Sequence, residues 1–226
     1  AYYLANVGFK VLLVDLDHQN QCKAYFKVTE FNNSSYELFM NQSLDTCDCI
    51  TRNVAPNLDL ITSSNQLIFY FVMDKLPQHQ TYLKEKLNQV IKDYDFIIID
   101  NRPDFDYFSI QSILASTKIL IPSTANNLGI EGIAPILNLT DNLIQDQKIS
   151  VLGIFLTQVQ ARTTEYQVLE EMVKKYYPNL CFETSIPRTQ VLSEITTIHK
   201  TAFEHSNNST GAKAYKSLCL ELCRKL

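Results

Sequence analysis

The sequence predicts an α/β fold with three layers, in which helices cover both faces of a mostly parallel sheet. Two short apolar runs, at 11–15 and 96–100, end in aspartate, and such runs are typical of strands buried on both faces. Segments with helical periodicity separate the apolar runs, as the crossovers between parallel strands require. The 226 residues are 46% hydrophobic without a linker-like stretch, which predicts a single domain over 1–226.

The individual elements follow from the spacing of apolar residues. Short apolar runs bounded by polar residues predict strands at 11–15, 58–62, 96–100, 118–122, 151–157 and 181–187. Apolar residues spaced three and four apart predict helices over 82–94, 131–144, 164–176 and 212–224. Thr163 or Thr164 is the expected N-cap of the third helix. Residues 18–57 mix aromatic, Asn and Ser residues without a period, so no element is predicted there.

The composition narrows the class of protein. The net charge is −4 and the pI about 5.6, so the chain as a whole has no attraction to nucleic acid, although a local basic patch is compatible with these values. No apolar run reaches the length of a membrane span, and no association with membranes is expected. The six cysteines form no CxxC pair, which favours buried thiols in a reducing compartment over a zinc site.

Three carboxylates are expected to gather where strands end. Asp15 and Asp100 close their strands, and alternation places Asp17 on the same side as Asp15. Ligands of open parallel sheets bind beyond the carboxyl ends of the strands. Carboxylates there suit Mg²⁺ held through water beside a phosphate group, and one of them could orient an attacking water. The alternative interpretation is that each aspartate only caps the following helix or turn.

Several segments, in order along the chain, resemble the ParA/Soj family of deviant Walker ATPases. VLLVDLDHQ at 11–19 is similar to the family's VLLIDxDPQ, and YDFIIID at 94–100 is similar to its Walker B strand. The later matches are KILIP at 118–122, GIEG at 129–132, GIFLT at 153–157, IPR with LSE at 186–194, and GAKAY at 211–215. The resemblance spans almost the whole chain and implies a fold like that of the P-loop NTPases.

The resemblance implies an ATPase that uses ATP and Mg²⁺. Asp17 matches the catalytic aspartate near the attacking water, and Asp15 matches the catalytic partner that supports the magnesium shell. Asp100 matches the Walker B aspartate, which faces Mg²⁺ through water. The implied enzyme is a cytoplasmic, nucleoid-associated ATP hydrolase for plasmid partition or chromosome segregation.

Further implied residues come from the second half of the chain. The family holds the adenine at positions that match Thr157, Gln158, Pro187 and Arg188. Family members carry basic residues for DNA contact where this chain has Arg188 and Lys213, and a solvated surface charge is the competing interpretation of both. The implied partners are a second copy in an ATP-dependent homodimer, nonspecific DNA, and a ParB-like centromere-binding protein.

The chain also departs from the family pattern. No GxxxxGK[ST] loop, which holds phosphates through backbone N–H groups and a lysine, occurs in the sequence. We therefore expect an N-terminal truncation that removes the first strand and the P-loop. His18 replaces the usual proline, and Asn101-Arg102-Pro103 replaces the usual TPP. Arg102 is expected to pair with Asp104 or Asp106 rather than with phosphate.

Two alternative functions remain beside the ParA-like ATPase. A MinD-like membrane-associated positioning ATPase would end in a basic amphipathic helix, whereas the tail at 217–226 has only two terminal cations. A degenerate interaction module without catalysis would keep the fold and dispense with the phosphate-binding loop.

Overall fold

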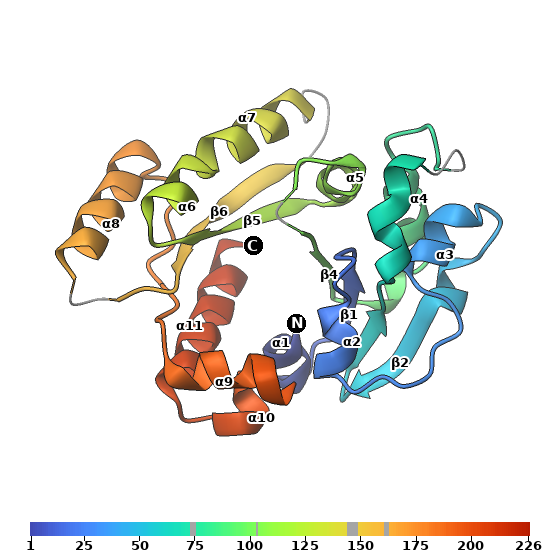
Figure 1. The fold of residues 1–226 in the computed structure, drawn as a ribbon, viewed down its shortest axis with the longest axis horizontal. Helices are drawn as coiled ribbons and strands as arrows, with labels where there is room; N and C mark the ends of the chain where they lie inside the picture. Colours follow the sequence, from blue (N-terminus) through green and yellow to red (C-terminus); the bar gives the residue numbers. More distant parts are fainter. Residues whose placement is uncertain (73–75, 103, 144–148, 161–162) are drawn as a thin grey trace. The chain divides into compact units, whose positions relative to one another are not determined.

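The chain folds into two compact units, each with its own sheet and core (Figure 1). In the computed structural model, the described residues are 1–72, 76–102, 104–143, 149–160 and 163–226. The first unit comprises Ala1–Ala115 and the second Ser116–Leu226. A single domain over the whole chain stays a prediction.

The first unit is built on a four-stranded sheet in the order β2-β3-β1-β4. β1 (Val11–Asp15) is parallel to both of its neighbours, β3 (Leu58–Ile61) and β4 (Phe96–Asp100). β2 (Ile50–Ala55) lies antiparallel at the edge, next to β3. All five residues of β1 are buried, as its unbroken apolar run predicts.

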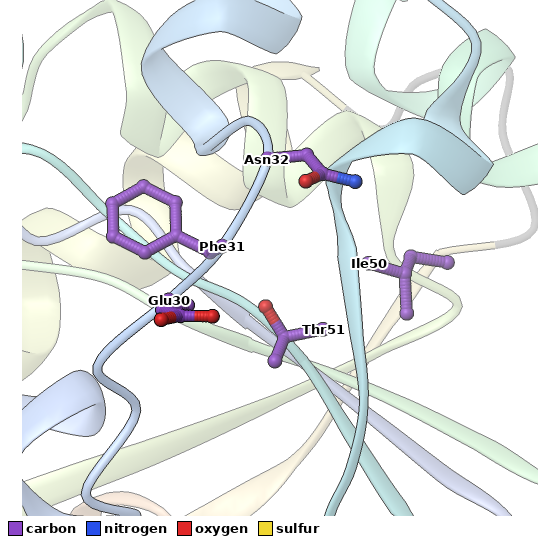
Figure 2. A pocket seen from close by; sticks show the side chains of 5 residues that line it. All are labelled: Glu30, Phe31, Asn32, Ile50 and Thr51. Carbon is purple, nitrogen blue, oxygen red and sulfur yellow. The ribbon is translucent and has the colours of Figure 1, made fainter.

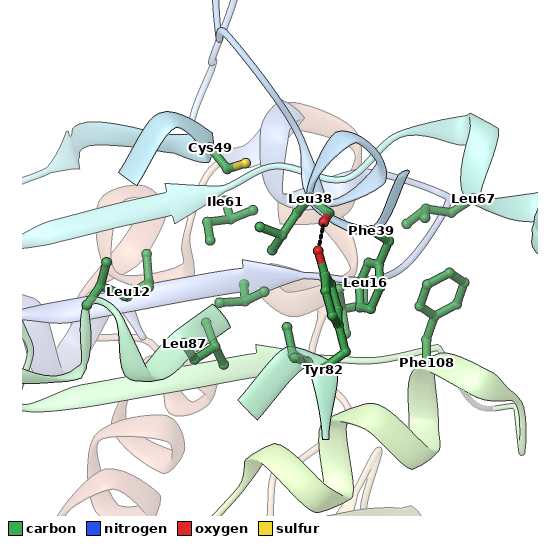
Figure 3. Close-up of a cluster of buried hydrophobic side chains, with 13 residues drawn as sticks. Leu12, Leu16, Leu38, Phe39, Cys49, Ile61, Leu67, Tyr82, Leu87 and Phe108 are labelled. Atoms are coloured by element: carbon green, nitrogen blue, oxygen red, sulfur yellow. Dashed lines mark hydrogen bonds between the residues drawn. The ribbon is translucent and has the colours of Figure 1, made fainter. Parts of the chain in front are cut away.

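One face of this sheet carries the core of the first unit (Figure 3). α3 (Ser35–Met40), α4 (Tyr82–Asn88) and α5 (Tyr107–Ala115) pack against it. The hydroxyl of Tyr82 donates a hydrogen bond to the carbonyl of Leu38 over 2.6 Å, the dashed line in Figure 3. The fully buried side chains include Leu12, Val14, Leu16, Leu38, Phe39, Ile61, Leu83 and Phe108.

Residues 18–57, where no element is predicted, contain regular structure. The segment holds α3, β2 and the short helices α2 (Gln21–Tyr25) and η1 (Thr46–Cys49). A capping box begins α3: the Ser34 side chain accepts from the N–H of Tyr36, and the Glu37 carboxylate accepts from the N–H of Ser34. This pattern is visible in the sequence as Ser-x-x-Glu before apolar residues.

The remaining elements of the first unit are short. α1 spans Tyr2–Asn6, and the 3₁₀ segment η2 spans Asn65–Val72. The helix predicted over 82–94 ends earlier, because the chain leaves α4 at Asn88 and continues as a 3₁₀ turn, η3 (Ile91–Asp93).

The second unit has a two-stranded parallel sheet of β5 (Lys118–Thr124) and β6 (Ser150–Thr157). Its helices are α6 (Asn127–Glu131), α7 (Ile133–Leu143), α8 (Thr164–Tyr176), α9 (Gln190–Ile198), α10 (Ala202–Ser206) and α11 (Thr210–Lys225). Thr163 caps α8 by accepting from the N–H of Tyr166, so that prediction is confirmed. The helix predicted over 131–144 is α7, and Ile144 lies outside the described residues.

Helices cover both faces of the second sheet. Ile154 and Leu156 of β6 pack with α7 and α8 on one face, through Ile133 and Val173. Phe155, which points to the opposite face, packs against α11 and the segment before α9. This alternation is the burial on both faces that the apolar run of β6 predicts.

The last predicted strand, at 181–187, is interrupted. It forms isolated bridges, at Cys181 with Ile154 of β6 and at Pro187 with Val159 just after β6, and the N–H of Ile186 donates to the carbonyl of Leu156 over 2.8 Å. Between these bridges, the backbone N–H groups of Glu183 and Thr184 donate to the Glu221 carboxylate of α11 at 2.8 and 2.9 Å. The Glu221 carboxylate thus satisfies two consecutive N–H groups, of which a ladder with β6 could use only one. Among the described residues, no helix is both long enough and apolar enough to cross a bilayer.

Candidate functional site

β1 and β4 end side by side, and each ends in an aspartate. In their parallel register Asp15 is paired with Asp100, and the N–H of Leu16 donates to the carbonyl of Asp100 over 2.9 Å. Partners in register on adjacent strands direct their side chains to the same face of a sheet. The structure therefore brings together the two strand-ending carboxylates that the sequence predicts.

Asp15 is completely buried and accepts two backbone hydrogen bonds. Its Oδ1 accepts from the N–H of Asp17 over 3.0 Å, and its Oδ2 accepts from the N–H of Cys22 over 3.3 Å. Burial nevertheless raises the pKa of Asp15 to about 7, and the charge of Asp100 contributes in the same direction. The turn that follows β1 thus wraps around this carboxylate.

Asp17 lies in that turn rather than in the strand. Its Oδ1 accepts from the N–H of Gln19 over 3.0 Å, and its carbonyl accepts from the N–H of Asn20. Asn20 has a φ of 52°, a left-handed conformation that asparagine tolerates better than most residues. Because β1 ends at Asp15, strand alternation does not determine the direction of the Asp17 side chain, contrary to the reasoning from sequence.

Cys22 is a site residue that the sequence analysis missed. Its thiol donates to Asp100 Oδ2 over 3.5 Å. Ligand atoms of Asp15, Cys22 and Asp100 all lie within 4.8 Å of one another. The cysteine pattern carried no signal for this site, since Cys22 forms no motif with another cysteine or histidine. Only its position at the start of the helix after the Asp-x-Asp segment could have indicated it.

The two strand-ending carboxylates fit a divalent cation. Burial raises the pKa of Asp15, and local desolvation also raises the pKa of Asp100, although Asp100 is exposed at the end of β4. Within the described part of the chain, neither forms an ion pair with lysine or arginine. Carboxylate oxygens are the ligands that Mg²⁺ takes in proteins, usually with several waters.

Arg102 is held by its neighbours on the loop after β4. Its Nε donates to Asp106 Oδ2 over 2.9 Å, and its Nη2 contacts the same oxygen. Asp104 lies 3.6 Å away, and Nη1 donates to Nδ1 of His18 over 3.1 Å. The predicted ion pair is confirmed, and the guanidinium also joins the loops after β1 and β4. Pro103 lies outside the described residues.

The predicted adenine-binding residues come together in the second unit. Thr157 ends β6, and Gln158 follows it with a left-handed φ of 55°. Pro187 forms a bridge with Val159, whose carbonyl accepts from the N–H of Arg188 over 2.9 Å. The two segments therefore lie side by side, and the binding of adenine by them stays a prediction.

The two predicted DNA-binding residues are both exposed. Arg188 lies just before α9, and Lys213 lies in the first turn of α11. Their exposure is compatible with DNA contact and with a solvated surface charge, so the alternative stays open.

An open pocket in the first unit is lined by other residues. Figure 2 shows its lining residues, Glu30, Phe31 and Asn32 of the loop before α3 with Ile50 and Thr51 at the start of β2. None of these five was predicted as a site residue, and none of the strand-ending carboxylates lines the pocket. It is therefore separate from the candidate site.

Comparisons with known proteins agree with this arrangement. Residues 1–153 match the family AAA_31, described as an AAA domain. The chain is 32% identical to the sporulation initiation inhibitor protein Soj of Bacillus subtilis, over 97% of this chain and 88% of that protein. It is 27% identical to the chromosome-partitioning ATPase Soj of Thermus thermophilus, over 100% of this chain and 88% of the relative.

A solved structure shares the fold. It is a Borrelia burgdorferi protein described as a plasmid partition protein and bound to AMPPNP, with a TM-score of 0.83 and 24% identity over 100% of this chain and 90% of that one. The α/β fold of the P-loop NTPase type, with helices on both faces of the sheet, is thereby confirmed. The chain therefore belongs to the AAA_31 family of AAA domains and, within it, to the ParA/Soj family of partition ATPases.

Proposed function

We propose that this protein is a ParA-type ATPase for plasmid or chromosome partitioning, with its ATP and Mg²⁺ site at the carboxyl ends of β1 and β4. The observation that carries the proposal is the paired register of Asp15 and Asp100, with Asp17 in the turn just beyond. In phosphoryl transfer the protein mainly positions groups and balances charge. A row of carboxylates at this edge can do both through a bound cation.

Each carboxylate has a distinct proposed role. Asp100 and Asp15 hold Mg²⁺ through water, and the cation supplies a positive charge beside the buried Asp15. Asp17 is half-buried, its carboxylate accepts from the N–H of Gln19 and lies 3.5 Å from Nδ1 of His18, and it orients the attacking water. The adenine is held in the second unit, by Thr157 and Gln158 with the adjoining Pro187 and Arg188.

Hydrolysis of ATP by the purified protein tests the catalytic assignment. Asp17→Ala should abolish Mg²⁺-dependent phosphate release, whereas Asp48→Ala, which removes an exposed carboxylate of η1, should leave it unchanged. Because the sequence contains no GxxxxGK[ST] loop, nucleotide binding is measured separately with a fluorescent ATP analogue. Equal hydrolysis by wild type and Asp17→Ala would show that the catalytic assignment is wrong. An absence of nucleotide binding by the wild type would instead count against an ATP site at the carboxyl ends of β1 and β4 in this chain.

We further propose an ATP-dependent homodimer that binds DNA nonspecifically and responds to a ParB-like partner. Arg188 and Lys213 are the proposed phosphate contacts, and each lost contact should lower the slope of log K against log salt by about one. Lys92→Ala, an exposed cation of η3, is the matched control. Sedimentation with and without ATP measures the dimer. Unchanged salt slopes in Arg188→Ala and Lys213→Ala would remove these residues from the interface.

The packing of α11 weighs against a MinD-like membrane anchor. An interfacial helix must turn its apolar side to the lipid. Leu218 of α11 is buried among Phe155, Phe182 and Ile186, with Leu222 packed against the same cluster. Sedimentation with anionic liposomes tests this, and binding of the protein to them would favour the membrane-associated function.

A further inference from the structure

Two residues at which the chain departs from the family pattern contact each other beside Asp17. Nη1 of Arg102, in the loop after β4, lies 3.1 Å from Nδ1 of His18. Since a guanidinium can only donate, Nδ1 of His18 is the acceptor in this hydrogen bond. Asp17 Oδ1 lies 3.5 Å from the same Nδ1. The contact between His18 and Arg102 therefore adjoins the carboxylate proposed to orient the attacking water.

His18 occupies the second position of the turn that carries Asp17. The N–H of Asn20 donates to the carbonyl of Asp17 over 2.8 Å, which closes a β-turn over residues 17–20. Proline is favoured at this position because its ring fixes φ at about −65°, and proline is the usual residue of the family pattern. Histidine has no such ring, so its side-chain contact with Arg102 supplies a restraint that proline would supply through the backbone.

Arg102 is itself anchored to the start of α5. Its side chain is 7% exposed, and the 5% exposed Asp106 accepts from its Nε over 2.9 Å and contacts its Nη2. The other carboxylate oxygen of Asp106 accepts from the N–H of Ser109, in the first turn of α5. This helix packs into the core of the first unit through Phe108. Because two guanidinium nitrogens contact Asp106, the third can reach a second loop.

We propose that Arg102 and His18 are positioning residues for ATP hydrolysis, because the guanidinium fastens the turn that carries Asp17 to α5. This role rests on the proposed function, and it assigns neither side chain a contact with the nucleotide. A misplacement of about 1 Å near the reacting atoms can cost roughly 100-fold in rate. Loss of the contact should therefore lower kcat and leave KM for ATP unchanged.

Arg102→Lys breaks the contact with the least damage, because lysine keeps a positive charge beside the buried Asp106 but has a single nitrogen. It should lower kcat about ten-fold at unchanged KM. His18→Ala should do the same, and the double variant should be no slower than either single variant, because both remove one interaction. Arg52→Lys and His79→Ala, which alter exposed residues of the same unit, are the matched controls and should leave kcat unchanged.

His18→Pro provides a rescue, since proline restrains the turn without Arg102. Adding Arg102→Lys to His18→Pro should change kcat by less than about two-fold. A ten-fold loss in that background would overturn the proposal, as would additive losses from Arg102→Lys and His18→Ala. A raised KM in Arg102→Lys would also overturn it, because the guanidinium would then act on the nucleotide directly.

Amide exchange in the nucleotide-free protein tests the contact without ATP hydrolysis, after urea denaturation has shown that each variant is folded. The N–H groups of Gln19 and Asn20 donate to Asp17 within the turn. They should exchange several-fold faster in Arg102→Lys and His18→Ala than in the wild type. Unchanged exchange in both variants would overturn the proposal. Faster exchange, together with a wild type that does not hydrolyse ATP, would support the restraint on the turn and refute the proposed ATPase.

Discussion

Replacing Asp15 with asparagine should stabilise the metal-free protein, and increasingly so as the pH rises. Burial raises the pKa of Asp15 from its ordinary value of 3.8 to about 7. Between these values the folded state keeps a proton that the unfolded chain has released, so the free energy of unfolding falls as the pH rises. At about 1.4 kcal/mol per pKa unit, the full effect is roughly 4 kcal/mol above pH 7. Asparagine has no charge and escapes this penalty.

The substitution also has a cost. The carboxylate accepts hydrogen bonds from the N–H groups of Asp17 and Cys22, at 3.0 and 3.3 Å. Asparagine can accept only one of them with its single oxygen, which offsets about 1 kcal/mol of the gain. The net stabilisation at about pH 8 is therefore roughly 3 kcal/mol, and it should be some 2–3 kcal/mol smaller at about pH 5.

Urea denaturation of both proteins in chelator-containing buffer, across this pH range, measures the difference. Asp48→Asn, an exposed carboxylate of η1, should show no such trend. A stability difference for Asp15→Asn that stays constant with pH would refute the assignment of a raised pKa to the buried carboxylate. Asp15→Asn should also lose Mg²⁺-dependent ATP hydrolysis, which would show that the stabilising change removes a functional group.

Three smaller changes test the packing around the sheets by urea denaturation. Tyr82→Phe keeps the ring but removes the hydroxyl that donates to Leu38, and it should lower the free energy of unfolding by about 1 kcal/mol. Glu221→Gln should cost about 1–2 kcal/mol near neutral pH, because the charged acceptor of two N–H groups is lost. Burial alone would raise the pKa of Glu221, but these hydrogen bonds lower it by more, so the net pKa lies below the ordinary value. The stability difference between the wild type and Glu221→Gln should therefore vanish as the pH falls through that lowered pKa. Gly153→Ala should cost about 1–3 kcal/mol, since a Cβ there would lie 2.5 Å from a backbone carbonyl oxygen.

Each change has a matched control at an exposed or open position. Tyr176→Phe, Glu171→Gln and Gly132→Ala should each alter the free energy of unfolding by less than about 0.5 kcal/mol. If a control variant lowers the free energy of unfolding as much as its test variant does, the contact named for that test variant does not stabilise the fold.

The parallel strands and the carboxylate pair were predictable because their signals are local. Val11–Asp15 and Phe96–Asp100 are continuous apolar runs, and each ends in its own aspartate. Two such strands in one parallel sheet must present both aspartates at the same edge. No knowledge of distant contacts was needed beyond the choice of a parallel sheet.

The features that escaped prediction depend on contacts between distant residues. Cys22 joins the site because the fold brings Asp100 to it, and no spacing in the sequence expresses that contact. The last predicted strand is interrupted where the Glu221 carboxylate, 37 and 38 residues away, accepts from two of its N–H groups. β2 was missed because only part of it is buried and its register with β3 shifts, so its apolar residues do not alternate regularly.

The position of β1 in the sheet has a consequence for folding during synthesis. β1 is the buried strand between β3 and β4, yet it precedes both of these partners in the chain. On the ribosome its five buried residues emerge early and must wait until residues 58–61 and 96–100 have been made. Pairing between such distant segments is slow, and the waiting strand is open to association with other nascent chains. We therefore expect this segment to be the aggregation-prone part of the nascent first unit until β4 is complete.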